Sequence, residues 1–161
     1  MEVSEIKKIR EYVSQKILSR GDYLQQLEAI GIFGSLARTD FTDRSDIDIF
    51  VVVDEVKDQE EETEKLWYDR ISDLLTELHR DVTVLVYSIK ALTKVATWHT
   101  IRLASEGILL YDKGKVKNIF EAIVKEAKRV GLVEKKFGRR KVWMMGRALK
   151  RGEIIEVTLE K

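Results

Sequence analysis

Two strand-length apolar segments, residues 29–33 and 46–53, constrain the fold of this chain more than any other feature. The second segment begins with Asp46 and Asp48, which alternate with isoleucines before a phenylalanine and three valines. Valine and isoleucine favour β-strands, and residues two apart in a strand project from the same face. We therefore predict two strands. Both aspartates should lie on one face of the second strand, and its isoleucines should pack in a core on the other face.

The two aspartates and the Gly-Ser pair that precedes them indicate a phosphate site. Carboxylates held close together repel each other unless a cation lies between them. Oxygen ligands of this kind suit Mg²⁺, which usually completes its coordination shell with water and substrate phosphates. Gly34 allows a phosphate to approach the backbone, and Ser35 supplies a hydroxyl where a short helical turn with free amides is predicted to begin. Arg38, one turn further along, can reach the same phosphates.

The whole run GSLARTDFTDRSDIDIFVVV resembles the DNA polymerase beta-like nucleotidyltransferase superfamily. The signature of that superfamily is Gly-Ser, about ten residues, and then Asp-x-Asp within a strand. In this chain Gly34 and Ser35 are followed by ten residues and then by Asp46 and Asp48. The run is most similar to the small "minimal nucleotidyltransferase" group of prokaryotes, and the resemblance is strongest over residues 29–54.

This resemblance implies an α/β (α+β) fold with a small mixed β-sheet and helices packed against it. It also implies an enzyme that uses Mg²⁺ to transfer a nucleoside monophosphate, AMP from ATP, to a hydroxyl acceptor. Asp46 and Asp48 would be catalytic and metal-binding residues, and Gly34, Ser35 and Arg38 would bind the nucleotide. The acceptor stays open between a protein side chain, a small molecule and an RNA end. Minimal nucleotidyltransferases are commonly paired with a separate HEPN toxin, so an antitoxin role is implied as a special case.

Active members of the superfamily usually carry a third carboxylate on a neighbouring strand. The strand predicted over residues 82–87 offers two registers for it. One register puts Asp81 at that position, and we take Asp81 as the third catalytic and metal-binding residue. The other puts Thr83 there, with Asp81 two residues earlier on the same face. Because a threonine brings no charge to a metal, the second register favours an inactive nucleotide-binding or regulatory module.

A second departure from the superfamily pattern follows the short helical turn. Many members have Arg-Gly there, whereas this chain has Arg38 and Thr39. We expect a turn that is less permissive than one with glycine, leading into a polar loop.

The remaining elements are predicted from apolar periodicity. Helices are expected over residues 3–19, 58–78, 90–105 and 116–130, and strands over 82–87, 108–111, 141–145 and 153–159, the last two as a β-hairpin. The helix that opens with the acidic run 58–64 should bury Leu66, Trp67, Ile71, Leu74, Leu75 and Leu78, and the three tryptophans should be packing anchors. Residues 1–111 are expected to form the nucleotidyltransferase domain, and residues 112–161 a C-terminal helix and β-hairpin packed on it.

The net charge of +1 hides an asymmetry between the two parts of the chain. Residues 113–161 carry 15 basic and 6 acidic side chains, whereas residues 1–112 carry 14 basic and 22 acidic ones. Two solvated parts that attract each other would explain this distribution, and so would a basic tail that binds RNA or another polyanion. The densest basic cluster contains Lys135, Lys136, Arg139, Arg140 and Lys141.

Composition excludes several classes of protein. The absence of cysteine excludes disulfides and thiolate metal sites. No apolar run approaches the roughly 20 residues of a membrane-spanning helix, and the charged N-terminus lacks the apolar centre of a signal peptide. We expect a soluble cytoplasmic protein without a membrane partner; its oligomeric state is open.

Overall fold

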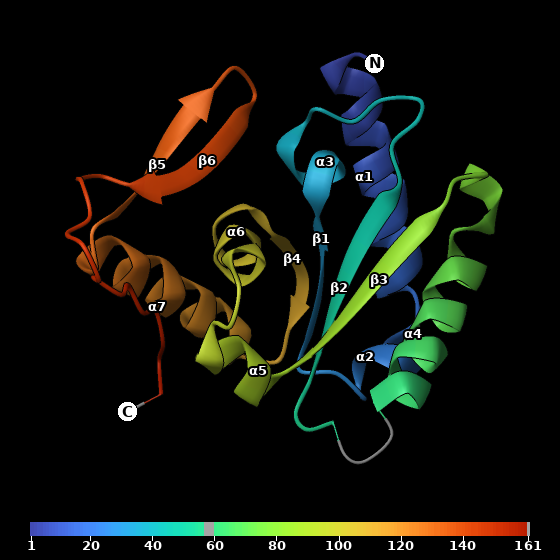
Figure 1. The fold of residues 1–161 in the computed structure, drawn as a ribbon. Coiled ribbons are helices and arrows are strands. Elements are labelled where there is room, and N and C mark those ends of the chain that lie inside the picture. The colour runs from blue at the N-terminus through green and yellow to red at the C-terminus, as the bar shows by residue number, and fades with distance from the viewer. Residues whose placement is uncertain (57–59, 161) are drawn as a thin grey trace.

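The two predicted strands form the centre of a mixed sheet in the computed structural model, which describes residues 1–56 and 60–160 (Figure 1). The strands of this sheet are β1 (Ala29–Phe33), β2 (Ile47–Val53), β3 (Val82–Ser88) and β4 (Ile108–Asp112). Strands β5 (Leu132–Phe137) and β6 (Arg140–Met145) form a separate hairpin. The helices are α1 (Val3–Leu18), α2 (Gly21–Leu24), α3 (Gly34–Arg38), α4 (Glu60–Leu74), α5 (Ile89–Lys94), α6 (Trp98–Glu106) and α7 (Val116–Arg129), with a 3₁₀ turn at Thr76–Leu78.

The strand order of the sheet is β3-β2-β1-β4. Strand β1 pairs antiparallel with β2 and with β4, whereas β2 and β3 are parallel. Parallel neighbours need a crossover connection, and helix α4 lies in the segment that connects them. The result is the α/β fold that the sequence predicts, with a small mixed β-sheet and helices packed against it.

The alternation along β2 divides the core into two parts. Ile47, Ile49 and Val51 pack in a cluster with side chains of α1 and α4, on what we call the first face of the sheet. Phe50 and Val52 pack with side chains of α6 and α7 on the second face (Figure 1). Since side chains alternate along a strand, Asp48 lies on the second face together with Phe50.

The predicted pairing of residues 141–145 with 153–159 is wrong. Strand β6 pairs instead with β5, in register from Leu132 opposite Met145 to Phe137 opposite Arg140. Only residues 138 and 139 connect these strands, and Gly138 has a φ of +62° that suits a tight hairpin turn. A short connection loses less entropy on closure than the seven residues between 145 and 153 would lose.

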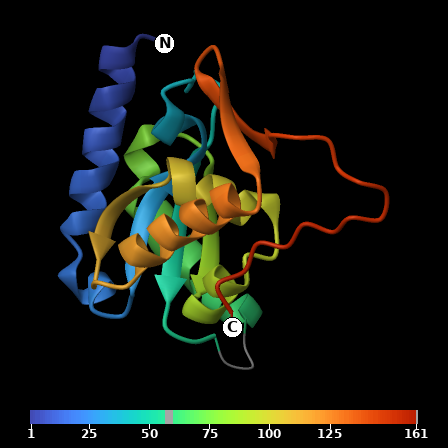
Figure 2. The same cartoon turned by 90° about the vertical axis from the view of Figure 1, so that its left-hand side faces the viewer.

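The segment after β6 has no regular secondary structure apart from a turn. It runs outward as a loop and returns to the body of the protein (Figure 2). Val157 and Leu159 pack against the second-face core, and the backbone N–H of Leu159 donates to the carbonyl of Thr93 at 2.9 Å. The apolar alternation that suggested a strand therefore reflects packing on α5 rather than pairing with a neighbour.

Two buried positions were also predicted wrongly. Leu66 is exposed because the buried residues of α4, Trp67 and Ile71, lie four apart and Leu66 falls outside that stripe. Trp98 is 55% exposed at the first residue of α6, whereas Trp143 is buried as expected.

The helix predicted over residues 90–105 is two helices. Val95 follows α5 with a φ of +50°, in the left-handed region that stops a right-handed helix. The acidic segment predicted to open α4 begins at residue 58; Asp58 and Gln59 lie outside the described residues. No helix within residues 1–56 and 60–160 is long and apolar enough to cross a membrane.

Candidate active site

The backbone of Gly34 lies directly against the carboxylate of Asp48. Phe33 at the end of β1 pairs with Asp48 on β2, so the chain turns into α3 beside this side chain. A Cβ atom added to Gly34 would lie 2.1 Å from Oδ2 of Asp48, and the φ of Gly34 is +69°. Both the space and the backbone conformation therefore require glycine. The structure brings together these two predicted site residues from opposite ends of the motif.

Asp48 has a raised pKa for reasons that describe the site. Burial is the largest cause, and the negative charge of Asp46 raises the pKa further. A hydrogen bond from the hydroxyl of Thr83 and the positive charge of Arg38 act in the opposite direction. A half-buried carboxylate that feels a second carboxylate is stabilised by a bound cation.

The register of β3 on β2 decides which residue neighbours Asp48. Asp48 pairs with Thr83, and Ile47 pairs with Val82. Asp81 precedes β3, is exposed, and accepts a backbone hydrogen bond from Ile47 at 2.9 Å, so it lies level with Asp46. Of the two registers considered from the sequence, this is the one with Thr83 beside Asp48. The role of Asp81 as a third ligand stays a prediction.

Arg38 lies at the end of α3 between two carboxylates. Its Nη1 is 3.4 Å from Oε2 of Glu106, and its Nε is 3.3 Å from Oδ1 of Asp40. All three side chains are largely buried, yet Nε of Arg38, Oδ1 of Asp40 and Oε1 of Glu106 each lack a hydrogen bond within residues 1–56 and 60–160. Arg38 is therefore held in place with hydrogen-bonding capacity left for a ligand.

A cavity of about 180 Å³ joins the predicted residues to helix α6. It is lined by Phe33, Gly34, Arg38, Asp48, His99, Arg102, Leu103 and Glu106. A larger cavity of about 560 Å³ lies between α6, α7 and the hairpin, where Phe120 and Trp143 line it. The smaller cavity is the candidate active site because it contains the carboxylate, the glycine and the arginine that the motif predicts; Ser35 is partly buried at the start of α3, beside it.

His99 was not predicted as a site residue. Its ring lies edge-on to Phe33, with 5.5 Å between the ring centroids, and its Nε2 is buried without a hydrogen-bond partner in the described part of the chain. Burial, together with the nearby charge of Arg102, lowers the pKa of His99, while Glu106 acts in the opposite direction. His99 lies outside any sequence motif, so no signal in the sequence indicated that it lines the candidate active site.

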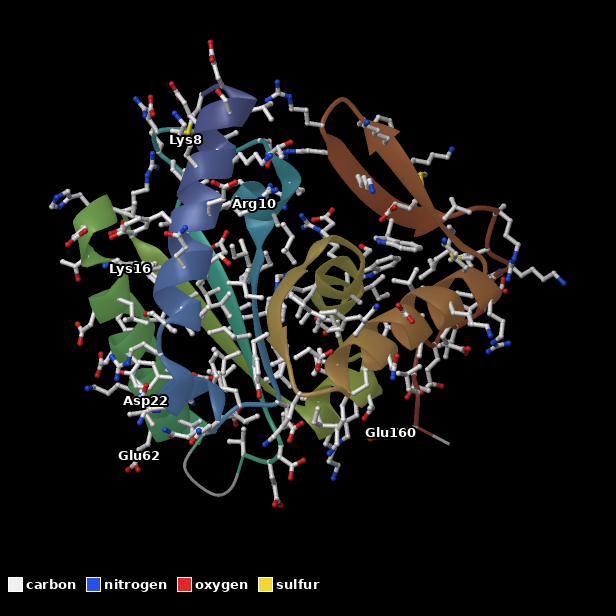
Figure 3. All side chains as sticks on the ribbon, turned by 180° about the vertical axis from the view of Figure 1, so that it is seen from behind. Lys8, Arg10, Lys16, Asp22, Glu62 and Glu160 are labelled. Carbon is white, nitrogen blue, oxygen red and sulfur yellow. The ribbon has the colours of Figure 1, made fainter. Side chains whose placement is uncertain are left out.

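Two arginines that the sequence analysis also missed hold the segment between β1 and β2. Arg10 of α1 donates to the carbonyl of Leu36 from Nε and Nη2, at 3.2 and 2.7 Å, and from Nη2 to the carbonyl of Ala37 at 3.2 Å. Figure 3 shows Arg10 on α1. Arg80 donates to the carbonyls of residues 42, 43 and 45 at 3.0 to 3.2 Å. Both ends of this segment are thus fixed to neighbouring elements.

Thr39 ends α3 in the conformation that glycine prefers. Its φ is 74° and its ψ is 16°, which is the left-handed helical region. Its backbone N–H donates to the carbonyl of Ser35 at 3.0 Å and so closes the short helix. The less permissive turn expected from Arg38 and Thr39 therefore appears as a strained backbone at Thr39.

The donor set of the site fits Mg²⁺. Asp46 and Asp48 offer carboxylate oxygens, and Mg²⁺ is typically bound by one or two carboxylates with waters and substrate phosphates. Within the described ranges, no group of three or more His, Cys, Asp or Glu side chains is arranged as a metal site. A metal held by Asp46 and Asp48, with Asp81 as the predicted third ligand, would therefore also need oxygens of the substrate.

Comparison with known proteins agrees with this geometry. The family model described as "Polymerase beta, Nucleotidyltransferase" matches residues 7–115. A search of curated proteins found no match.

Three solved structures are similar to this chain in fold. Their sequence identities are too low to support a conclusion about function. One is a toxin–antitoxin complex with AMP-PNP, with 22% identity over 66% of this chain and 79% of that chain and a TM-score of 0.48. The second, from Sulfolobus solfataricus, is assigned as a nucleotidyltransferase; it has 20% identity over 70% and 88% of the two chains and a TM-score of 0.45. The third is a mutant of the toxin–antitoxin MntA–HpeT, with 18% identity over 74% and 80% and a TM-score of 0.43.

Proposed function

The chain belongs to the polymerase beta nucleotidyltransferase family, and from this premise we propose that it transfers AMP from ATP to a hydroxyl acceptor in a Mg²⁺-dependent reaction. The observation that carries the proposal is the contact between Gly34 and the Asp48 carboxylate in a cavity that also contains Arg38. In this arrangement the carboxylate of Asp48 can hold a metal ion, and the backbone of Gly34 and the guanidinium of Arg38 can bind the oxygens of a triphosphate.

Each residue has a proposed part in the reaction. The acceptor hydroxyl attacks the α-phosphorus as pyrophosphate leaves, so orientation and charge stabilisation supply most of the catalysis. Asp46, Asp48 and Asp81 are the proposed ligands of Mg²⁺, which when bound neutralises charge on the reacting oxygens. Gly34 and Ser35 bind phosphate oxygens at the start of α3.

Arg38 and His99 complete the proposed nucleotide contacts. Arg38 faces Asp40 with its Nε and Glu106 with its Nη1, and its Nη2, which makes no hydrogen bond in the described residues, can donate to a phosphate without breaking either ion pair. Because His99 has a lowered pKa, its ring is neutral at pH 7, and its buried Nε2 is available to a hydroxyl of the nucleotide.

The test is transfer of label from α-labelled ATP in the presence of Mg²⁺ and a lysate of the source organism, separated into protein, RNA and small molecules. The wild type is expected to label one fraction. The double variant Asp46→Asn, Asp48→Asn is expected to lose at least about 100-fold of that transfer, because both charges are removed from the site. Asp73→Asn, at an exposed position of α4, is the matched control and is expected to retain it. Full transfer by the double variant would contradict the proposal.

The second candidate function is a nucleotide-binding module without transfer. Thr83 favours it, because this uncharged side chain is the β3 neighbour of Asp48. Calorimetry with ATP and Mg²⁺ separates the two functions: binding without labelling of any fraction would favour the module. Thr83→Asp would then be expected to increase transfer if the missing charge is the cause.

The sequence resemblance leaves the acceptor open between a protein side chain, a small molecule and an RNA end, and implies as a special case a HEPN toxin with this chain as its antitoxin-type partner. Labelling of a protein that co-purifies with the chain would support this special case. Labelling confined to the RNA fraction would replace it with a nucleic-acid acceptor.

A further inference from the structure

A second hollow adjoins the active-site cavity. We call it the α6–hairpin pocket; its volume is about 270 Å³. It shares Arg38 and Arg102 with the active-site cavity, so the two hollows meet at these arginines. The rest of its wall is formed by Trp98, Arg140, Lys141, Val142 and Trp143, from α6 and β6. A molecule bound in this pocket would lie next to a nucleotide bound beside Asp48.

The pocket is rich in positive charge. One of its lining residues is Arg102, whose guanidinium makes no hydrogen bond or ion pair with the residues that the structure describes. Lys141 is 3.8 Å from Glu134, and Arg140 is 3.3 Å from Asp40 with a side chain that is 73% exposed. Asp40 and Glu134 are largely buried, but the two cations are at least half exposed, so both can also contact a phosphate on their open side. The wall therefore suits an anion.

The pocket also offers aromatic surface. Trp98, predicted to be buried, is 55% exposed at its rim. Trp143 forms part of the wall and is held there by a hydrogen bond from its indole N–H to Oγ of Ser105 at 3.0 Å. An exposed indole is unfavourable in water, and beside cations it provides a stacking surface for a base.

The hairpin continues this chemistry away from the pocket. Lys135, Lys136 and Arg139 are exposed along β5 and the turn, next to Phe137, which is 61% exposed. The hairpin tip is attached beside the active site, since Arg139 donates to the carbonyl of Thr39 at 3.2 Å. A flexible ligand longer than one nucleotide could therefore contact positive charge and aromatic surface from the hairpin to the pocket.

We propose that the α6–hairpin pocket binds the 3′ end of a single-stranded RNA, which makes RNA the acceptor of the transfer proposed above. Stacking on Trp98 and phosphate contacts from Arg102, Arg140 and Lys141 would position the terminal ribose at the arginines that border the active-site cavity. Its 3′-hydroxyl oxygen forms the new bond to the α-phosphorus of the nucleoside triphosphate. The bond from that phosphorus to the bridging oxygen breaks, pyrophosphate leaves with the electron pair, and the hydroxyl proton passes to solvent. This use of the pocket depends on the proposed function, whereas RNA binding itself does not.

The first test measures RNA binding by the full chain without nucleotide, as fluorescence anisotropy of a labelled single strand of about 12 nucleotides. Trp98→Ala is expected to weaken binding about 10-fold, because stacking of one base is lost, and Trp98→Phe is expected to restore most of it. Arg102→Gln with Lys141→Gln is expected to flatten the salt dependence by about 1.4 logarithmic units per logarithmic unit of salt. Lys8→Gln, at an exposed site on α1 that Figure 3 labels, and its double variant with the exposed neighbour Lys7→Gln, which removes the same two charges, are the controls and should change neither quantity.

Several results would overturn the proposal. These are absence of RNA binding, equal binding by Trp98→Ala and Lys8→Gln, and a parallel loss of ATP affinity in Trp98→Ala, which would assign the pocket to the triphosphate. In a second test, α-labelled ATP should label RNA with a 3′-hydroxyl and leave 3′-deoxy RNA unlabelled. If RNA binds through Trp98 but is never labelled, the pocket is an RNA-binding site and the proposal that it is the acceptor site is wrong. Label that appears only on protein rejects RNA as the acceptor while keeping the transferase.

Discussion

The two faces of the sheet differ in how completely they are packed. On the first face, α1 and α4 cover Ile47, Ile49 and Val51 with an apolar cluster, and one buried side-chain atom of the described residues there, Oγ of Ser72, lacks a hydrogen bond. On the second face, α6, α7 and the hairpin leave cavities. Buried side-chain atoms of the described residues that lack a hydrogen bond are more numerous there, and they belong to Arg38, Asp40, His99, Glu106 and Glu134.

Because of this difference, one strand contributes both to the apolar core and to the candidate active site. Successive residues of β2 serve the two tasks in turn, because Ile47 and Ile49 fill the first face while Asp48 faces the second. The stability of the closely packed first face offsets the cost of polar groups on the second face that lack hydrogen bonds until a ligand binds. Substitutions on the two faces should therefore have different, and in one case opposite, effects on the free energy of unfolding.

The largest effect is expected from Ile49→Ala on the first face. Ile49 is fully buried, and its truncation should reduce the free energy of unfolding by an amount near the upper end of about 2–5 kcal/mol, since the packed cluster has little room to relax. Leu103→Ala, beside the active-site cavity on the second face, should fall near the lower end of that range. Urea denaturation measures both. Equal losses, or a larger loss for Leu103→Ala, would contradict the contrast between the faces.

A gain is expected from Thr39→Gly at the end of α3. Glycine adopts the φ of 74° without the steric conflict that threonine has there, so the free energy of unfolding should rise by about 1 kcal/mol. Glu11→Gly, at an exposed position inside α1, should reduce it by about the same amount. Thermal unfolding of the two variants checks the signs. A loss for Thr39→Gly would show that the turn is not strained.

The smallest effect is expected from Asp48→Asn on the second face. Burial raises the pKa of Asp48 in the folded protein, so its stabilising contribution is complete below the unfolded-state value of about 3.9 and is lost as the pH rises through the folded-state value. The variant should therefore be more stable than the wild type at pH 7, by less than about 1 kcal/mol because solvent screens this partly exposed group. The difference should shrink towards pH 3.

Urea denaturation at several pH values measures this difference. Asp73→Asn, at an exposed position of α4, serves as the control for the loss of one carboxylate. A variant that is less stable than the wild type at pH 7 would show that the charge of Asp48 is stabilised in the folded protein without a ligand.

The segment from β1 to β2 could be predicted from the sequence because several local signals agree there. An apolar run that ends at Gly34 and a β-branched run after Asp46 define both strands, and the contact of Gly34 with Asp48 follows from the motif. The neighbour of Asp48 on β3 could not be predicted, because Asp81 and Thr83 lie on the same face in either register.

Other features left no pattern in the sequence that could be recognised. Arg10 and Arg80 act on backbone carbonyls, and any arginine on α1 or before β3 would look the same in the sequence. The hairpin was misassigned because Lys135 and Lys136 were read only as part of a basic cluster, whereas they belong to β5. Hydrophobic alternation at residues 155–159 competed with that strand and reflects packing on the second-face core.

The attachments of the two regions should respond differently to concentrated salt solutions. Arg10 and Arg80 bind neutral carbonyl oxygens, as Arg139 of the hairpin does at Thr39, whereas Arg140 of the hairpin forms an ion pair with the largely buried Asp40. At about 1 M salt the screening length falls to roughly 3 Å, which weakens the ion pair far more than the bonds to carbonyls. In strong brine the contact between Arg140 and Asp40 is therefore expected to loosen first, while the Arg139 bond to Thr39 and the buried Trp143 keep the β5–β6 arm in place.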